Sequence, residues 1–170
     1  MKNLMIVSTC FLTLAFSCRE QNQPMNLSCV EYWAEINFAN FCGLSMSNFD
    51  FNSIPNDICN ADQNSSYPFD DLVSIRVFNH FSSDAAKDEY DTEEADALLV
   101  GGYTALTDLG DDAYAILNSQ FGELDDAIVL VLFDTYTVYV EVNGNAVNGA
   151  NNCFDESSVI EFARSLVSPL

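Results

Sequence analysis

Two neighbouring stretches decide the fold: Ala127-Ile128-Val129-Leu130-Val131-Leu132-Phe133 and Thr137-Val138-Tyr139-Val140-Glu141-Val142. Both are rich in branched aliphatic residues, which favour strands. The first is apolar at every position, as expected of a strand that is buried on both faces inside a sheet. Because only Asp134-Thr135-Tyr136 separates them, the two stretches are predicted to pair as an antiparallel hairpin.

Two further strands are predicted upstream of this hairpin. In Leu72–Phe81, apolar residues alternate with Ser74 and Arg76, which indicates a strand with one buried face. Ala113–Leu117 follows a glycine turn and is the second candidate. The segment 39–70 shows no sustained period, so we expect an irregular, disulfide-held chain with at most one short strand there.

Three helices complete the pattern. Ser28 and Glu31 have the spacing of a capping box for a helix at 29–38. An acidic helix is expected to begin at Ser82-Ser83-Asp84, reach Leu99 and end at Gly101-Gly102. Asp155 caps the last helix, whose apolar face comprises Val159, Phe162, Ala163, Leu166 and Val167. This order predicts an α+β fold: an antiparallel sheet of about four to five strands with helices packed mainly on one face, stapled by disulfides.

The charge balance restricts the possible partners. The chain has 170 residues, of which 49% are hydrophobic, and it carries 26 acidic residues against five Lys and Arg, a formal net charge of −21. So acidic a surface excludes nucleic acid and anionic membrane surfaces as binding partners. It favours a cationic protein partner, although adaptation to high salt would produce the same composition without any partner.

The N-terminus has the features of an export signal. Lys2 precedes the apolar run Leu4–Phe16, which is too short to span a membrane, and Ala15-Phe16-Ser17-Cys18 leads into polar sequence. This arrangement resembles the signal of bacterial lipoproteins, in which the chain is cut before a cysteine that receives diacylglycerol.

The lipoprotein resemblance implies three regions. They are a signal peptide at 1–17, a lipid-anchored tether at 18–27 and a single domain at 28–170, with Cys18 as the lipidated residue. The protein would then be held at the bacterial cell envelope and face the periplasm or the cell surface. Cleavage after Ser17 by an ordinary secretory peptidase, or retention of the apolar run as an anchor, are the alternatives.

The cysteine count agrees with lipidation. Cys10 would leave with the signal peptide and Cys18 would carry lipid, so an even number remains: Cys29, Cys42, Cys59 and Cys153. In an oxidising compartment these should form two disulfides, for which three pairings exist. We favour Cys42 with Cys59 and Cys29 with Cys153. A zinc site is disfavoured because no C-x-x-C pair occurs and the chain has a single histidine.

Catalytic and metal-binding patterns are weak. His80 is the only histidine, and no G-x-S-x-G elbow is present to support a serine triad. Adjacent carboxylates are unspecific and are expected to be turn residues; they are Asp70-Asp71, Asp111-Asp112 and Asp125-Asp126. The run Asn48–Ser53 resembles the start of an EF-hand loop but lacks its glycine and its glutamate. A looser calcium site around Asp108, Asp111 and Asp112 stays open. We therefore expect no enzyme, no bound metal and no cofactor.

Aromatic residues are dense between positions 38 and 69. They could line a ligand groove, or they could fill the core beneath a long loop. The residues concerned are Phe38, Phe41, Phe49, Phe51, Tyr67 and Phe69.

A second resemblance concerns the domain. From Val73 onward come a strand, an alanine-containing helix, a segment of the form Gly102-Tyr103-x-x-x-x-x-Leu109-Gly110-Asp111-x-Ala113, a hairpin and a last helix. This order resembles small bacterial envelope lipoproteins of unknown function, and it implies a fold and a location rather than an activity. We expect a non-enzymatic envelope lipoprotein that binds a protein or a small ligand. The alternative is an acidic inhibitor or immunity protein directed against a cationic hydrolase.

Overall fold

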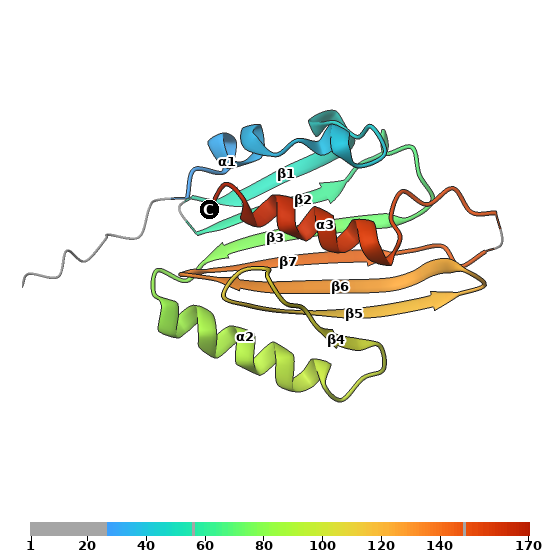
Figure 1. Cartoon of the computed structure of the whole chain (residues 1–170). Helices are drawn as coiled ribbons and strands as arrows, with labels where there is room; N and C mark the ends of the chain where they lie inside the picture. The colour runs from blue at the N-terminus through green and yellow to red at the C-terminus, as the bar shows by residue number, and fades with distance from the viewer. Residues whose placement is uncertain (1–26, 56, 148) are drawn as a thin grey trace, which may run out of the picture.

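The computed structural model describes residues 27–55, 57–147 and 149–170, in which seven strands form one antiparallel sheet (Figure 1). The strands are β1 (Phe49–Ile54), β2 (Ile58–Gln63), β3 (Leu72–Asn79), β4 (Tyr103–Ala105), β5 (Asp112–Gln120), β6 (Glu123–Phe133) and β7 (Tyr136–Asn143). The helices are α1 (Cys29–Glu35), α2 (Ser83–Ala97) and α3 (Glu156–Val167), with the 3-10 turns η1 (Phe38–Asn40) and η2 (Met46–Asn48). The α+β class is confirmed, and the strand count exceeds the expected four to five.

The sheet consists of two meanders that meet at one seam. Its order is β1-β2-β3-β7-β6-β5-β4, so the first meander is β1-β2-β3 and the second runs back from β4 to β7. Helix α2 carries the chain from β3 to β4 at the far edge. The meanders join where β3 pairs with β7, in a register from Leu72 opposite Asn143 to Asn79 opposite Tyr136.

The central hairpin is confirmed as β6 and β7, both in the interior of the sheet. β6 is buried on both faces, as its uniformly apolar sequence predicts. Val129 and Val131 belong to the main core with α3, whereas Leu130 and Leu132 belong to a smaller core beneath α2.

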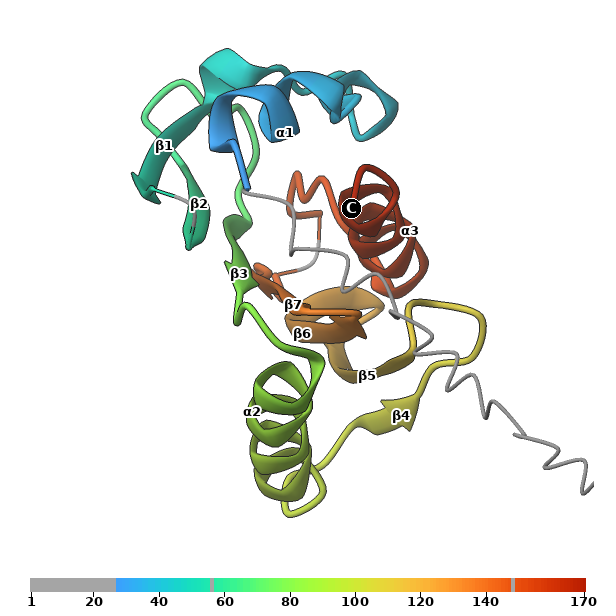
Figure 2. The same cartoon turned by 90° about the vertical axis from the view of Figure 1, so that its left-hand side faces the viewer.

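Helices cover both faces of the sheet. Figure 2 shows α1 and α3 on one side of the strands and α2 on the other. The expectation of helices mainly on one face therefore holds for α1 and α3 but not for α2. Tyr90 of α2 is completely buried against the sheet although most of that helix is polar, so one aromatic side chain gives α2 much of its attachment.

The segment 39–70 is not irregular, because it contains the hairpin of β1 and β2. Its strand pattern is faint for two reasons. β1 is an edge strand in which only Phe49 is fully buried, and the inward residues of β2 are the small Cys59 and Ala61. Small residues fit there because the aromatic residues of the N-terminal segment supply the bulk of the core above them.

The helix caps agree with the sequence in part. Asp155 caps α3 through a hydrogen bond that its carboxylate accepts from the Ser158 N–H at 2.7 Å, and Ser82 caps α2 through the Ala85 N–H. Ser28 precedes α1 as predicted, but its side chain makes no capping hydrogen bond. The capping box of Ser28 and Glu31 is therefore wrong. Instead, the disulfide of Cys29 holds the first residue of α1.

The four described cysteines form two disulfides, but the favoured pairing is wrong. Cys29 is joined to Cys59, with Cα atoms 5.4 Å apart, and Cys42 to Cys153, with Cα atoms 5.7 Å apart. A local bond between Cys42 and Cys59 was favoured on the expectation of an irregular segment. The β2 strand instead directs Cys59 into the core beneath α1, while the turn at Cys42 lies against the chain that leads into α3.

Peptide mapping of the unreduced protein should find Cys29 linked to Cys59 and Cys42 linked to Cys153, with no free thiol among the four. The double variant Cys42→Ser/Cys153→Ser should lose more stability than Cys29→Ser/Cys59→Ser, because the sequence separations are 111 and 30 residues. Loop-closure entropy predicts a difference of roughly 1 kcal/mol in the free energy of unfolding. A peptide that links Cys42 to Cys59 would contradict this connectivity.

Candidate functional site

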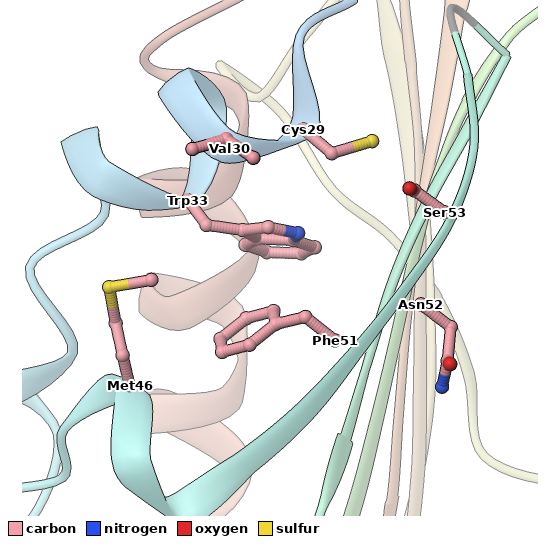
Figure 3. A pocket seen from close by; sticks show the side chains of 7 residues that line it. All are labelled: Cys29, Val30, Trp33, Met46, Phe51, Asn52 and Ser53. Carbon is pink, nitrogen blue, oxygen red and sulfur yellow. The ribbon is translucent and has the colours of Figure 1, made fainter.

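An apolar pocket lies at the corner where α1 and η2 meet the edge strand β1 (Figure 3). Its volume is about 220 Å³. Seven residues line it: Cys29, Val30, Trp33, Met46, Phe51, Asn52 and Ser53. Carbon-rich side chains dominate this lining, so the pocket is suited to an apolar group.

The pocket has an aromatic base and an exposed apolar rim. The rings of Trp33 and Phe51 lie with their centroids 5.3 Å apart and face one another in Figure 3. Trp33 is almost completely buried, whereas Val30 is 82% exposed and Met46 is 44% exposed. The base is therefore rigidly packed, while the rim presents apolar side chains to solvent.

The disulfide of Cys29 fixes one wall of the pocket. It connects the first turn of α1 to β2, directly beside the edge strand that supplies Phe51. Because α1 has only seven residues, it could not hold this position by its own helical stability. The covalent bond therefore keeps the spacing between α1 and β1 that leaves the pocket open.

The pocket borders an open strand edge. Two backbone hydrogen bonds at the ends of β2 show which residues of β1 are bonded to β2. The Asn64 N–H donates to the Asn48 carbonyl at 3.0 Å, and the Asn79 N–H donates to the Asp57 carbonyl at 2.8 Å. By that alternation Asp50, Asn52 and Ile54 bond to β2, whereas the backbone groups of Phe51 and Ser53 point away from it. In the described chain, no other strand pairs with β1.

The aromatic residues of the segment 38–69 serve mainly as core. Phe38 and Phe49 are buried, and Phe41, Tyr67 and Phe69 are partly buried against the main cluster. Phe51 alone among the six lines the pocket. Most of the six aromatic residues therefore belong to the core, and Phe51 alone also lines a groove.

His80 lies in a polar cluster on the α2 side of the sheet. Its Nε2 is 2.9 Å from the hydroxyl of Thr137, and its Nδ1 is 3.8 Å from the carboxylate of Glu89. Glu89 also forms an ion pair with Arg76 at 3.3 Å. The order hydroxyl, imidazole, carboxylate is that of a nucleophilic triad. Thr137 is only 1% exposed, however, so a substrate could not reach its hydroxyl in this conformation.

Burial lowers the pKa of His80 below its ordinary value of 6.5. Glu89 and Asp57 oppose this shift, while Arg76 adds to it. The imidazole side chain is 6% exposed, which accounts for the dominance of desolvation. His80 is thus a neutral structural residue near pH 7, in agreement with its expected place at the end of a strand.

The paired carboxylates serve as structural hydrogen-bond acceptors. Asp71 is fully buried and accepts hydrogen bonds from the backbone N–H groups of Cys153 and Phe154 and from the Tyr67 hydroxyl, each at 3.0 Å. Asp111 accepts one from the Asp134 N–H at 2.7 Å. In the third pair, Asp125 accepts a hydrogen bond from the side-chain amide of Gln120.

The calcium candidates do not form a site. Residues 48–53 run from the end of η2 into β1 rather than around a loop. Asp108 has a left-handed backbone, and its carbonyl accepts a hydrogen bond from Arg164. Within the residues that the structure describes, no group of three or more His, Cys, Asp or Glu side chains could hold a metal ion.

Helix α2 presents an acidic surface. It contains seven acidic residues and one lysine, and Lys87 pairs with Asp91 at 2.5 Å while Glu89 pairs with Arg76. For the other five acidic side chains, which are all on the same helix, the described residues provide no ion pair; they are Asp84, Asp88, Glu93, Glu94 and Asp96.

The lipidation candidate Cys18 and the segment 1–26 lie outside the described residues. In the part of the chain that is described, no helix has the length and apolarity needed to cross a bilayer. Comparison with models of known protein families, with curated proteins and with solved structures gave no match.

The lowered pKa of His80 makes folding stability depend on pH. As pH falls below 6.5 the unfolded chain binds the proton more readily than the folded chain, so stability decreases. The variant His80→Gln should weaken this dependence between about pH 7.5 and pH 5.5, a range in which carboxylates contribute less. Urea unfolding of both proteins at several pH values tests this, and a His80 pKa at or above 6.5 by NMR would contradict it.

Proposed function

We propose that this chain is a non-enzymatic binding module of the bacterial cell envelope, anchored by lipid on Cys18, that receives a protein ligand at the pocket beside β1. The observation that carries the proposal is the exposed apolar rim of Val30 and Met46 above a rigid aromatic base. The two side chains adjoin a preformed apolar pocket, which distinguishes them from exposed apolar residues elsewhere on the surface and supports a binding role.

The position of the pocket in the chain agrees with a membrane anchor. Cys29 and Val30 line the pocket, and they follow the expected tether directly. A fully extended chain spans at most about 3.5 Å per residue, so the ten residue-to-residue steps from Cys18 to Ser28 would keep the pocket within roughly 35 Å of the lipid. The partner is therefore expected in or near the same membrane.

The inaccessible hydroxyl of Thr137 supports a role in binding rather than catalysis. His80, the only histidine, is also almost completely enclosed between the sheet and α2. Both side chains have partners that explain their presence in structural terms: Thr137 contacts His80, and His80 contacts Glu89.

A second candidate function is supported by α2. Its five acidic side chains without an ion pair could attract a cationic hydrolase, as expected for an inhibitor or immunity protein. This surface lies on the opposite face of the sheet from the pocket (Figure 2), so the two candidates can be distinguished by position.

The anchor is tested by Cys18→Ser. We expect the variant in the soluble fraction and the parent in the detergent phase, because serine lacks the sulfur to which diacylglycerol would be attached. Mass spectrometry of the parent should show the lipid. A soluble parent with unmodified Cys18 would contradict the lipoprotein part of the proposal.

The binding site is tested by position-specific photocrosslinking in envelopes. A photoreactive residue at Val30 should capture a defined partner, whereas one at Leu99 should not, although the two sites are matched at 82% and 83% exposure. A third position, Asp88, reports on the acidic surface of α2. Crosslinks from Asp88 alone would favour the inhibitor, and equal capture from Val30 and Leu99 would contradict a specific pocket.

A further inference from the structure

We infer that the open edge of β1 receives an extended, basic segment of the partner as an added antiparallel strand, with an apolar side chain of that segment in the pocket. This inference rests on the proposed function and specifies the chemistry of the partner. Strand addition supplies affinity through the backbone and specificity through pockets for alternate side chains.

The backbone of β1 has outward hydrogen-bonding groups that a further strand could pair with. The N–H and C=O groups of Phe51 and Ser53 point away from β2, and the described residues provide no partner for them. The Phe49 N–H, by contrast, is already bonded to the Met46 carbonyl. A segment placed opposite Phe51 and Ser53 would therefore find two consecutive pairs of backbone groups at ladder spacing.

The side chains of an added strand would reach the correct surfaces. Residues directly opposite one another in a sheet project to the same face, and the side chains of Phe51 and Ser53 line the pocket. A partner residue opposite either position would therefore project toward the pocket. The neighbouring partner residues would project to the other face, where Asp50 lies.

On the face of the sheet where Asp50 lies, a positively charged partner side chain would be favourable. Asp50 of β1 is directly opposite Asp62 of β2, which places two exposed carboxylates side by side. Like charges at opposed positions are destabilising, so a cation beside Asp50 would relieve their repulsion. From Cys29 to Gln63 the chain has five acidic residues and no lysine, arginine or histidine. The fitting segment thus alternates apolar and basic residues.

Apart from the charge of Asp50, the edge of β1 has no local feature that prevents pairing. Natural sheets guard their edges with short strands, lysine, proline or bulges. β1 has six residues in regular register and none of these features, whereas the opposite edge strand β4 has only three residues. A second copy of this chain is a poor occupant, because each copy carries a formal net charge of −21.

The test uses the purified full-length protein and a synthetic peptide of alternating lysine and valine. Trp33 is the only tryptophan of the chain and lies at the base of the pocket, so its fluorescence reports occupancy. We expect a saturable change that weakens with added salt. A glutamate–valine peptide should bind weakly for lack of charge complementarity, and a peptide N-methylated at its valines should bind weakly for lack of ladder hydrogen bonds.

Two variants separate backbone from charge. Ser53→Pro removes an outward N–H without touching the bonds to β2, a position where an edge strand tolerates proline, and it should weaken binding by about tenfold. Its control is Ser53→Ala. Asp50→Asn should weaken binding by about two- to fivefold, whereas the matched control Asp88→Asn on α2 should leave it unchanged. If Ser53→Pro fails to fold, the N-methylated peptide still tests the backbone bonds.

The outcomes separate this inference from the proposed function. Unchanged binding by Ser53→Pro or by the N-methylated peptide would overturn strand addition, while a Trp33 response would still support an apolar pocket. If no peptide binds but Val30 crosslinks a partner, the inference fails and the function stands; without either signal both fail. A wild-type dimer that Ser53→Pro dissociates would assign the edge to a second copy and overturn the inference.

Discussion

The pairing of β3 with β7 is the contact on which the rest of the fold depends. It joins the meander β1-β2-β3 to the meander β4-β5-β6-β7 over eight residue pairs separated by more than fifty positions in the chain. Without it, α2 would have no continuous sheet to cross, and α3 would have no concave face that combines β6 and β7 with the N-terminal segment. The core agrees with this dependence, because Val73, Ile75 and Val77 of β3 and Val138, Val140 and Val142 of β7 are all buried in one cluster. Such a long-range pairing has a high cost in loop-closure entropy, which these six valine and isoleucine side chains offset by burial.

Two disulfides attach the N-terminal segment to the rest of the domain. α1 is short and η1 and η2 are single turns, so they contribute little stability of their own. One disulfide joins α1 to β2, and the other joins the turn after η1 to the chain before α3. The buried carboxylate of Asp71 also binds that chain, through the N–H groups of Cys153 and Phe154. This combination lets the aromatic side chains of 38–51 pack rigidly although the β1–β2 hairpin is at the rim of the sheet. The pocket at Trp33 is a consequence of this arrangement: the bridge sets the spacing, and the edge position leaves it open.

Sequence patterns predicted the elements whose burial is one-sided or complete, and they failed where burial is slight. β3, β7 and α3 have a clear periodicity because each presents an apolar face to the core, whereas β6 is apolar throughout because both of its faces are buried. Asp155 marked the start of α3 through its side-chain cap. β1 and β2 escaped prediction because an edge strand needs few apolar residues and because Cys59 and Ala61 are small. The wrong disulfide pairing followed from that omission, since connectivity depends on which strand turns a cysteine inward. Of the pocket residues, Phe51 was among the aromatic residues proposed to line a groove. Val30 and Met46 were not predicted, because residues so far apart in the chain are brought to one pocket only by the packing of α1 and η2 against β1.

Charge and edge geometry together explain why an acidic chain can keep an unprotected strand. In most sheets an exposed regular edge invites self-association, and lysine at the edge is a common defence. Here a formal net charge of −21 repels a second copy at long range, so the edge of β1 needs no lysine to remain unpaired. In the proposed binding mode the same charge would attract basic segments, so that one property would both hinder pairing between two copies and favour a basic partner. The acidity of α2 acts in the same direction at longer range, since it adds to the field that a cationic partner encounters before it reaches the short-range contacts at Phe51 and Trp33. Affinity at the edge would then arise from backbone hydrogen bonds and one buried apolar side chain, with the electrostatic field governing the rate of encounter.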